Sequence, residues 1–294
     1  MSLSARLGIG LMRAIAHVPL PLLRGFGALL GNVLYVVAVR RRHVVDVNLA
    51  LCFPDKSLAE RRRIARESFV YVAQSWLDRS WLWHGSRELV LRRVALTGAP
   101  EDIELVLHGK EPVIVFAPHF YGLDAGAIAL TGRTDRLAIT IYTTQRNQVV
   151  DEWARQGRTR FGNVRALRRV DGIKPVIAGL RQGGMLYLLP DMDFGRDQTV
   201  FVPFYGVQAS TVPSLSRFAR LGRAKVVPVL SRFTPSGYET MVLPVWRDFP
   251  SDDAKADTAL MNSRLESYID TMPSQYYWVH RRFKTRPEGE GPAY

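Results

Sequence analysis

Beyond residue 110 the sequence alternates between short runs rich in β-branched residues and longer stretches with helical spacing, and this feature restricts the fold most. The predicted strands cover residues 113–117, 138–142, 185–189, 225–230 and 240–243. The predicted helices between them cover residues 149–161, 172–181 and 211–221. Alternation of this kind is typical of a parallel sheet with helices packed on its faces. We therefore predict an α/β fold with a mostly parallel central sheet flanked by helices.

A longer helix is predicted before this region, over residues 58–83. Apolar residues recur there every three to five positions, at Ile64, Phe69, Val72 and Trp76. This spacing indicates an amphipathic helix with one buried face. The start of the helix is strongly basic, with Arg61, Arg62, Arg63 and Arg66.

The first 43 residues differ from the rest, because residues 26–39 carry no charge and are followed directly by Arg40, Arg41 and Arg42. A secretory signal is excluded, since no small-residue cleavage site follows the apolar run and the arginines favour a cytoplasmic anchor. Fourteen helical residues reach only about 21 Å, less than the ~30 Å hydrocarbon core of a bilayer. We predict a membrane-anchoring segment over 1–43 and a single folded domain over 44–294. The segment is an interfacial helix or a tilted span, and a buried core helix is the alternative.

The overall charge indicates an anionic partner. The chain has 40 Lys and Arg against 27 Asp and Glu, a net charge of +13. Such a field favours nucleic acid, an anionic membrane, a phosphorylated lipid or an acidic protein, and charge alone does not choose among them. The single cysteine, Cys52, excludes an intramolecular disulfide framework and suits a reducing compartment.

The motif APHFYGLD at 117–124 places His119 just after a predicted strand and five residues before Asp124. Gly122 allows a tight turn into the next helix, so the carboxylate of Asp124 is expected to reach the imidazole. A carboxylate at one ring nitrogen leaves the other free to act as a general base. The alternative is a structural histidine with Asp124 as a helix cap.

Two further charged clusters are candidates for substrate contact. Asp191 and Asp193 follow the strand predicted at 185–189 and offer either a Mg²⁺-type Asp-x-Asp pattern or partners for arginine side chains. The stretch 155–162 holds three arginines at a helix end, which suits a phosphate clamp as well as an ordinary surface. The sequence has no dinucleotide fingerprint and no P-loop, and we expect no cofactor and no metal ion.

The stretch QYYWVHRRFKTRPEGE at 275–290 interleaves aromatic and basic residues. It fits a nucleic-acid surface built from stacking and phosphate contacts. It fits equally well a strand with an apolar inner side that brings basic residues to the entrance of a site.

These segments together resemble the late acyltransferases of lipid A biosynthesis, the lauroyl and myristoyl transferases of the lysophospholipid acyltransferase superfamily. The shared landmarks occur in the same order over nearly the whole chain: NLALCFPDKSLAERRR, PHFYGLD, GLRQGGMLYLLPDMDFG, VFVPFYG and HRRFKTRPEG. The resemblance implies transfer of a fatty acyl chain from acyl carrier protein to a hydroxyl of a lipid A precursor, at the cytoplasmic face of the inner membrane. It implies no nucleic-acid partner.

The resemblance also assigns residues. His119 and Asp124 occupy the family's His-x-x-x-x-Glu/Asp motif as the catalytic pair, with Asp where these enzymes more often have Glu. Arg158 occupies the position of a site arginine, and Asp191 belongs to a Pro-Asp landmark, with Asp193 beside it. After Tyr142 the chain lacks the usual arginine and proline, and Arg146 is expected to supply that charge.

Two other functions fit the same features. In the first, the chain is an acyltransferase whose acceptor is another membrane lipid with a free hydroxyl. In the second, it is a non-catalytic basic protein that binds membranes or nucleic acid. A catalytic site requires His119 and Asp124 within hydrogen-bond reach beside an apolar tunnel, whereas a binding protein requires a continuous basic groove.

Overall fold

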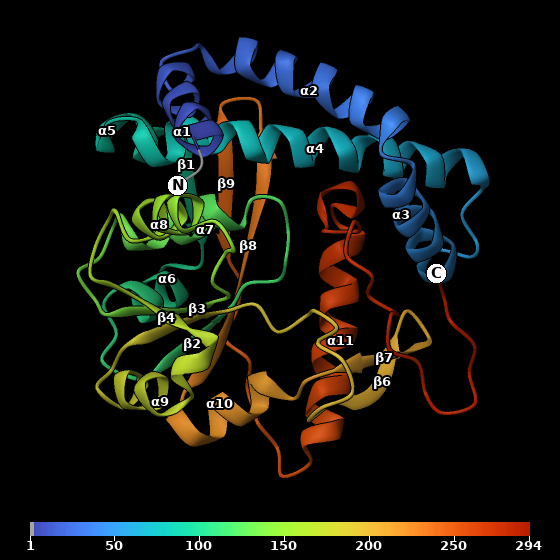
Figure 1. Ribbon diagram of the computed structural model, residues 1–294. Coiled ribbons are helices and arrows are strands. Elements are labelled where there is room, and N and C mark those ends of the chain that lie inside the picture. The colour runs from blue at the N-terminus through green and yellow to red at the C-terminus, as the bar shows by residue number, and fades with distance from the viewer. Residues whose placement is uncertain (1–2) are drawn as a thin grey trace.

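The computed structural model describes residues 3–294 and confirms the α/β fold (Figure 1). Its seven-stranded sheet contains, in spatial order, β1 (Val94–Gly98), β9 (Gly237–Val242), β8 (Lys225–Thr234), β2 (Val113–Phe116), β5 (Met185–Leu188), β3 (Ala138–Tyr142) and β4 (Val164–Arg168). All neighbouring strands run parallel except β8 and β9, which form an antiparallel hairpin. A separate two-stranded hairpin joins β6 (Val200–Phe204) to β7 (Val207–Thr211).

Both faces of the central strands are buried, as expected for a parallel sheet. All four residues of β2 are fully buried: Val113 and Val115 pack into one hydrophobic core, and Ile114 and Phe116 into another. The helices of the sheet region are α5 (Arg87–Arg93), α6 (Pro100–Leu107), α7 (Leu123–Thr131), α8 (Gln148–Arg158), α9 (Lys174–Arg181), α10 (Ser214–Gly222) and α11 (Ala254–Asp270). Two short 3-10 turns, η1 (Arg169–Asp171) and η2 (Pro273–Gln275), complete this part of the fold.

Every strand and helix predicted beyond residue 110 is present, with ends that differ by a few residues. Two strands of the sheet, β1 and β4, were not predicted, and they lie at its two edges. The β6–β7 hairpin and helix α11 were not predicted either. β4 has the sequence VRALR, and its two exposed arginines hide the apolar run that marks a buried strand. An edge strand tolerates such residues because one of its sides faces solvent.

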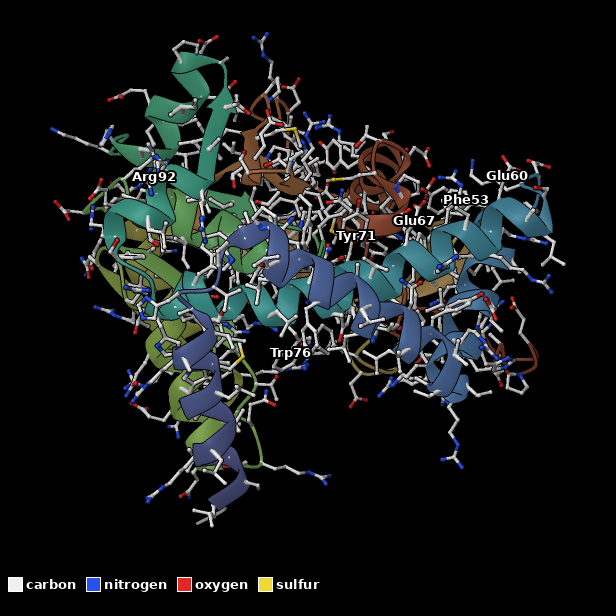
Figure 2. All side chains as sticks on the ribbon, turned by 90° about the horizontal axis from the view of Figure 1, so that it is seen from above. Phe53, Glu60, Glu67, Tyr71, Trp76 and Arg92 are labelled. Carbon is white, nitrogen blue, oxygen red and sulfur yellow. The ribbon has the colours of Figure 1, made fainter. Side chains whose placement is uncertain are left out.

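Four helices precede the sheet: α1 (Leu3–Ile15), α2 (Leu20–Val37), α3 (Val39–Cys52) and α4 (Leu58–His84). The long helix predicted at 58–83 is confirmed as α4, which begins at a capping box between Ser57 and Glu60. Seen from above, α2 runs over α4 (Figure 2). The contact is close because a Cβ added at Gly31 would lie 2.5 Å from the Cα of Val70 on α4.

The outward face of α1 and α2 is apolar. Large side chains that are about half or more exposed are Leu3, Leu7, Leu11, Leu22, Phe26, Leu29, Val33, Val36 and Val37. Among the described helices, α2 alone is long and apolar enough to cross a membrane, and its inner side packs on α4. The boundary expected after residue 43 falls inside α3, so the protein backbone continues through it as helix.

Candidate active site

The loops after β2 and β5 carry His119 and Asp191, which meet at one edge of the sheet. The two strands are parallel neighbours, and Phe116 pairs with Leu188 at their ends. Continuing that register by three residues places His119 opposite Asp191. Ligand sites of open α/β sheets gather at this carboxyl edge of the strands.

Asp191 holds His119 through two hydrogen bonds. The ring Nδ1 lies 2.7 Å from Oδ1 of Asp191, and the backbone N–H of His119 donates to Oδ2 at 3.0 Å. The hydroxyl of Tyr276 donates to the same Oδ2 at 3.0 Å. Burial alone raises the pKa of Asp191, but the adjacent imidazole and these three donors outweigh it and lower that pKa below its usual value. Asp191 is therefore a carboxylate that accepts from Nδ1, which leaves Nε2 as the acceptor of the neutral ring.

The predicted hydrogen bond between His119 and Asp124 is not formed, because His119 pairs with Asp191 instead. Asp124 instead accepts a hydrogen bond from Nε of Arg79 at 2.8 Å and a longer one from Nε of Arg158 at 3.4 Å. The cause is the tight turn before α7, where a Cβ added at Gly122 would lie 2.5 Å from the carbonyl oxygen of Ser231. The turn starts α7 beneath α4 and aims the carboxylate at the arginines of α4 and α8.

Arg79, Arg158 and Asp124 form a compact charged cluster. Burial raises the pKa of Asp124, but the two guanidinium groups outweigh it and lower that pKa below its usual value. Arg79 stacks on Trp76, with 4.3 Å between its guanidinium carbon and the centre of the ring. Its Nη1 is buried without a hydrogen-bond partner among the described residues. The cluster carries one net positive charge, and its more exposed member, Arg158, suits an anionic or carbonyl oxygen of a substrate.

Arg158 is the only arginine of the 155–162 stretch that pairs with Asp124 in the described structure. Arg155 pairs with Glu152 on α8, and Arg160 donates to the carbonyl oxygens at the end of α4. The stretch is therefore one site arginine between two structural ones. Arg79 was not found from the sequence, where one arginine among many in a long helix gives no signal.

Asp193 and Arg146 lie apart from this cluster. The carboxylate of Asp193 accepts from the backbone N–H of Thr285 at 2.7 Å and from its hydroxyl at 2.9 Å, and its own N–H donates to Nε2 of His280 at 3.1 Å. Asp193 thus fastens the C-terminal segment to the loop after β5. Arg146 is exposed on the loop after β3 and has no ion pair among the described residues. Residues 3–294 contain no group of three His, Cys, Asp or Glu side chains placed to hold a metal ion.

The aromatic and basic C-terminal segment packs against the site with its aromatic side inward. Apart from one antiparallel bridge between Phe120 and Tyr276 it is irregular rather than a strand. The backbone N–H of Tyr277 donates to the carbonyl oxygen of His119 at 3.0 Å, and the two rings lie 6.2 Å apart. This segment therefore forms a wall of the site, and Tyr276 ties it to Asp191.

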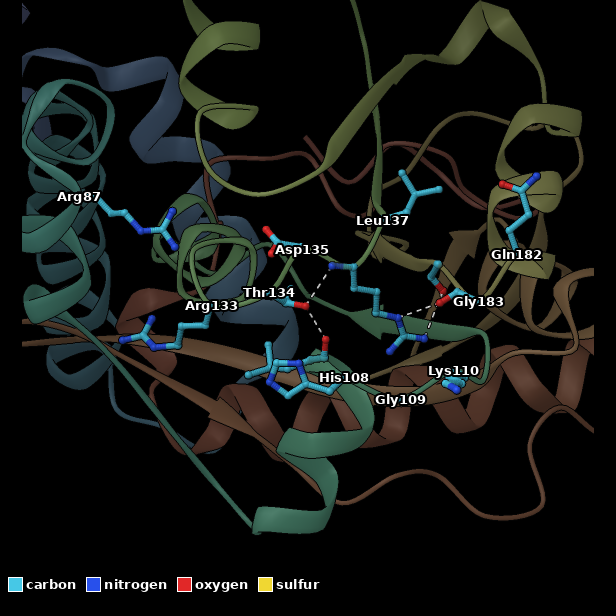
Figure 3. Close-up of a pocket in the computed structure, with 13 residues that line it drawn as sticks. Arg87, His108, Gly109, Lys110, Arg133, Thr134, Asp135, Leu137, Gln182 and Gly183 are labelled. Atoms are coloured by element: carbon cyan, nitrogen blue, oxygen red, sulfur yellow. Dashed lines mark hydrogen bonds between the residues drawn. The ribbon is translucent and has the colours of Figure 1, made fainter.

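A cavity of about 740 Å³ lies away from His119, at the amino ends of β2, β3 and β5 (Figure 3). Its walls are basic, with Arg87, Lys110, Arg133 and Arg136 among the lining residues. Arg133 and Arg136 donate hydrogen bonds to backbone carbonyl oxygens of neighbouring helices and loops, so both have a structural role. The strands separate this cavity from the histidine, so it is not part of the candidate active site.

Comparison with known proteins agrees with the resemblance in the sequence. The family model described as bacterial lipid A biosynthesis acyltransferase matches residues 3–285. The chain is 34% identical to the lipid A biosynthesis lauroyltransferase of Escherichia coli over 98% of this chain and 94% of that protein. It is 33% identical to the lipid A biosynthesis myristoyltransferase of E. coli over 99% of this chain and 90% of that protein. A lipid A biosynthesis acyltransferase of Haemophilus influenzae is 32% identical over 97% and 88% of the two chains. The chain therefore belongs to the bacterial lipid A biosynthesis acyltransferase family.

Proposed function

We propose that this acyltransferase moves a fatty acyl chain from acyl carrier protein to a hydroxyl of a lipid A precursor, with His119 as the general base. The observation that carries the proposal is the hydrogen bond from Nδ1 of His119 to the buried Asp191, at 2.7 Å. It fixes the ring with Nε2 as the proton acceptor and stabilises the imidazolium that forms when Nε2 takes a proton. The side chain of His119 is 19% exposed, so the ring remains accessible.

The reaction needs one tetrahedral intermediate. Nε2 removes the proton of the acceptor hydroxyl while its oxygen attacks the thioester carbonyl, and the C–O bond forms. The C–S bond then breaks, and the imidazolium returns its proton to the departing thiolate. Positioned donors stabilise the oxyanion of such intermediates, and the Arg79 and Arg158 guanidinium groups are the candidates here.

The roles of the other candidates follow from their contacts. Asp124 acts on the reaction by holding Arg79 and Arg158, since an ionised carboxylate fixes both guanidinium groups. Arg158, whose side chain is 35% exposed, is the more accessible of these two arginines, and Arg146 offers a second exposed cation that suits a phosphate of the acceptor. Asp191 and Asp193 contribute indirectly, by orienting His119 and by fastening the wall of the site.

Direct transfer without an acyl-enzyme agrees with the state of the one cysteine. Cys52 is buried at the end of α3, and burial raises its pKa well above the usual value. A buried neutral thiol is a poor nucleophile. We therefore assign no covalent step to it.

The acceptor is a membrane lipid in this proposal, and the apolar face of α1 and α2 supplies the contact with the bilayer. Arg40, Arg41 and Arg42 follow that face directly and suit the anionic lipids of the cytoplasmic side of the inner membrane. Figure 2 shows Trp76 beside α2, on the α4 helix that also carries Arg79. Helix α4 therefore carries both Trp76, beside the apolar face, and Arg79 of the charged cluster.

Mass spectrometry of lipid A tests the proposal. Cells that lack the protein are compared with cells that regain the wild type or the variant His119→Ala. The wild type is expected to restore one acyl chain on lipid A, and the variant is expected to restore none. If the missing chain instead appears on another lipid class, the acceptor is wrong; if no lipid changes, the proposed activity is wrong.

A further inference from the structure

The loops after β4 and β5 form a basic surface with exposed apolar residues on the edge of the sheet that carries His119. We call the set of Arg169, Val170, Ile173, Lys174 and Phe194 the basic loop surface. Between residues 143 and 174 the chain has eight Lys and Arg against three Asp and Glu, a net charge of +5. This stretch alone supplies a large part of the positive charge of the protein.

Strand register places this surface level with the candidate active site. Tyr187 of β5 pairs with Thr140 of β3, and Tyr142 of β3 pairs with Arg168 of β4. The strands from β2 to β4 are all parallel, so the end of β4 at Arg168, which Val170 follows closely, lies at the same edge of the sheet as His119 and Asp191. β4 is three strands from β2, so the lateral separation is about 14 Å at ~4.8 Å per strand.

The apolar residues of the basic loop surface are highly exposed to solvent. Val170 is 84% exposed, Phe194 is 47% exposed and Ile173 is 37% exposed. The guanidinium carbon of Arg169 lies 4.4 Å from the centre of the Phe194 ring, which joins the loop after β4 to the loop after β5. Apolar side chains gathered among cations are a mark of a protein interaction site, whereas one isolated exposed residue is not.

We propose that the basic loop surface docks the acidic carrier protein that presents the acyl thioester. The inference rests on the proposed function, because it assigns a place to the donor of that reaction. Charge complementarity selects an acidic partner, and the short distance lets an extended thioester arm reach His119 from a protein bound at the edge of the sheet.

A membrane is the other partner with suitable chemistry, and the position of the surface disfavours it. In Figure 1 β4 lies well away from α2, which carries the broad apolar face. Three apolar residues on the basic loop surface compare with nine on the outward face of α1 and α2. The bilayer therefore has its own surface, and the basic loop surface remains for the donor.

The test uses a double charge reversal, Arg169→Glu with Lys174→Glu, in the full-length protein. Both side chains are exposed, and an acidic residue in the first turn of α9 is compatible with its helix dipole. The matched control reverses two exposed cations elsewhere, Arg247→Glu in a loop with Lys255→Glu in the first turn of α11. Thermal unfolding is measured first, and both variants are expected to keep the wild-type midpoint within about 2 °C.

The decisive measurement is the dissociation constant of fluorescently labelled acyl carrier protein in low salt. The reversal on the basic loop surface is expected to raise it about tenfold or more, the control less than twofold, and added salt is expected to remove the difference. An unchanged constant overturns the inference. The inference is also overturned if the reversal abolishes binding to anionic phosphatidylglycerol vesicles while carrier binding stays intact, since that result assigns the surface to the membrane. Because binding requires no turnover, a failure of the proposed reaction is detected separately, as carrier binding without an acylated product.

Discussion

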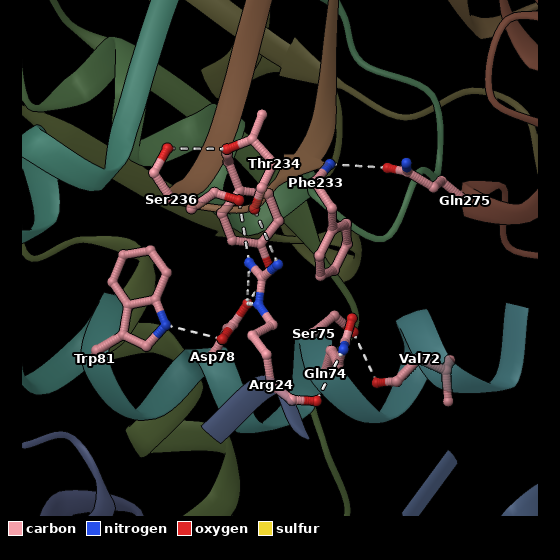
Figure 4. A network of polar contacts seen from close by, with 12 residues as sticks. Arg24, Val72, Gln74, Ser75, Asp78, Trp81, Phe233, Thr234, Ser236 and Gln275 are labelled. Carbon is pink, nitrogen blue, oxygen red and sulfur yellow. Dashed lines mark hydrogen bonds and ion pairs between the residues drawn. The ribbon is translucent and has the colours of Figure 1, made fainter. Parts of the chain in front are cut away.

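Replacing Arg24 with methionine should destabilise the whole protein, because this arginine of α2 is paired with a buried carboxylate (Figure 4). Its Nε donates to Asp78 of α4 at 2.9 Å, and the side chain of Asp78 is fully buried. The hydroxyl of Tyr238 and the indole N–H of Trp81 donate to the same carboxylate, at 2.7 and 2.9 Å. The guanidinium also donates to the carbonyl oxygens of Thr234 and Gly237 in the β8–β9 hairpin.

The magnitude follows from what the substitution leaves behind. Methionine keeps the apolar packing of the arginine stem, but Asp78 becomes a buried charge with only two neutral donors. Breaking a buried ion pair by removing one partner typically costs about 3 to 5 kcal/mol. Two carbonyl oxygens of the hairpin lose a charged donor as well, so we expect a loss of about 4 kcal/mol in the free energy of unfolding.

Urea unfolding in detergent, followed by tryptophan fluorescence, measures this loss. The control is Arg40→Met, an exposed arginine at the start of α3, for which the expected change is within about 0.5 kcal/mol. A loss below about 1 kcal/mol for Arg24→Met would show that α2 is a detachable anchor rather than part of the packed structure. The same result would refute the reasoning from the buried pair.

Three other predictions concern pH, packing and the membrane. Burial and the nearby Arg282 lower the pKa of His280 from 6.5 to about 4, so the unfolded chain binds a proton that the folded chain does not. Stability is therefore full above about pH 6.5 and falls by at most about 3 kcal/mol as the pH drops to 4, and His280→Gln should flatten this part of the curve in pH-dependent urea titrations. Gly157→Ala would place a Cβ 2.2 Å from the ring of Trp83, so α8 must shift. This shift should cost about 1 to 3 kcal/mol of stability, and it should lower kcat/KM because it moves the adjacent Arg158. Wild-type stability together with wild-type kcat/KM would contradict the tight contact. Replacing three outward leucines of α1 with serine should weaken vesicle flotation without changing the urea midpoint, since none of the residues of α1 is buried.

Much of the sheet could be predicted because buried parallel strands are continuous apolar runs. Val113 to Phe116 is such a run, and its position fixed the expectation that His119 lies at the carboxyl edge of the sheet. β4 escaped detection because an edge strand carries arginines on its open side. The sequence thus indicates the centre of an α/β sheet more reliably than its borders.

The partner of His119 illustrates what local spacing does not reveal. Asp124 is five residues away in sequence, and Asp191 is 72 residues away, yet Asp191 makes the hydrogen bond. The register between β2 and β5 decides this pairing, and register is set by the packing of whole strands. Arg79 was missed for a similar reason, since its contact with Asp124 depends on how α4 crosses the start of α7.

The central claim is that His119 is the base for acyl transfer, and the turnover of His119→Gln tests it most directly. Purified wild type and variant are compared at saturating acyl carrier protein thioester and lipid A precursor, with urea midpoints measured in parallel. The account predicts a kcat lowered by about 10² to 10⁴-fold at an unchanged midpoint. A folded variant that keeps kcat within threefold of the wild type would contradict it.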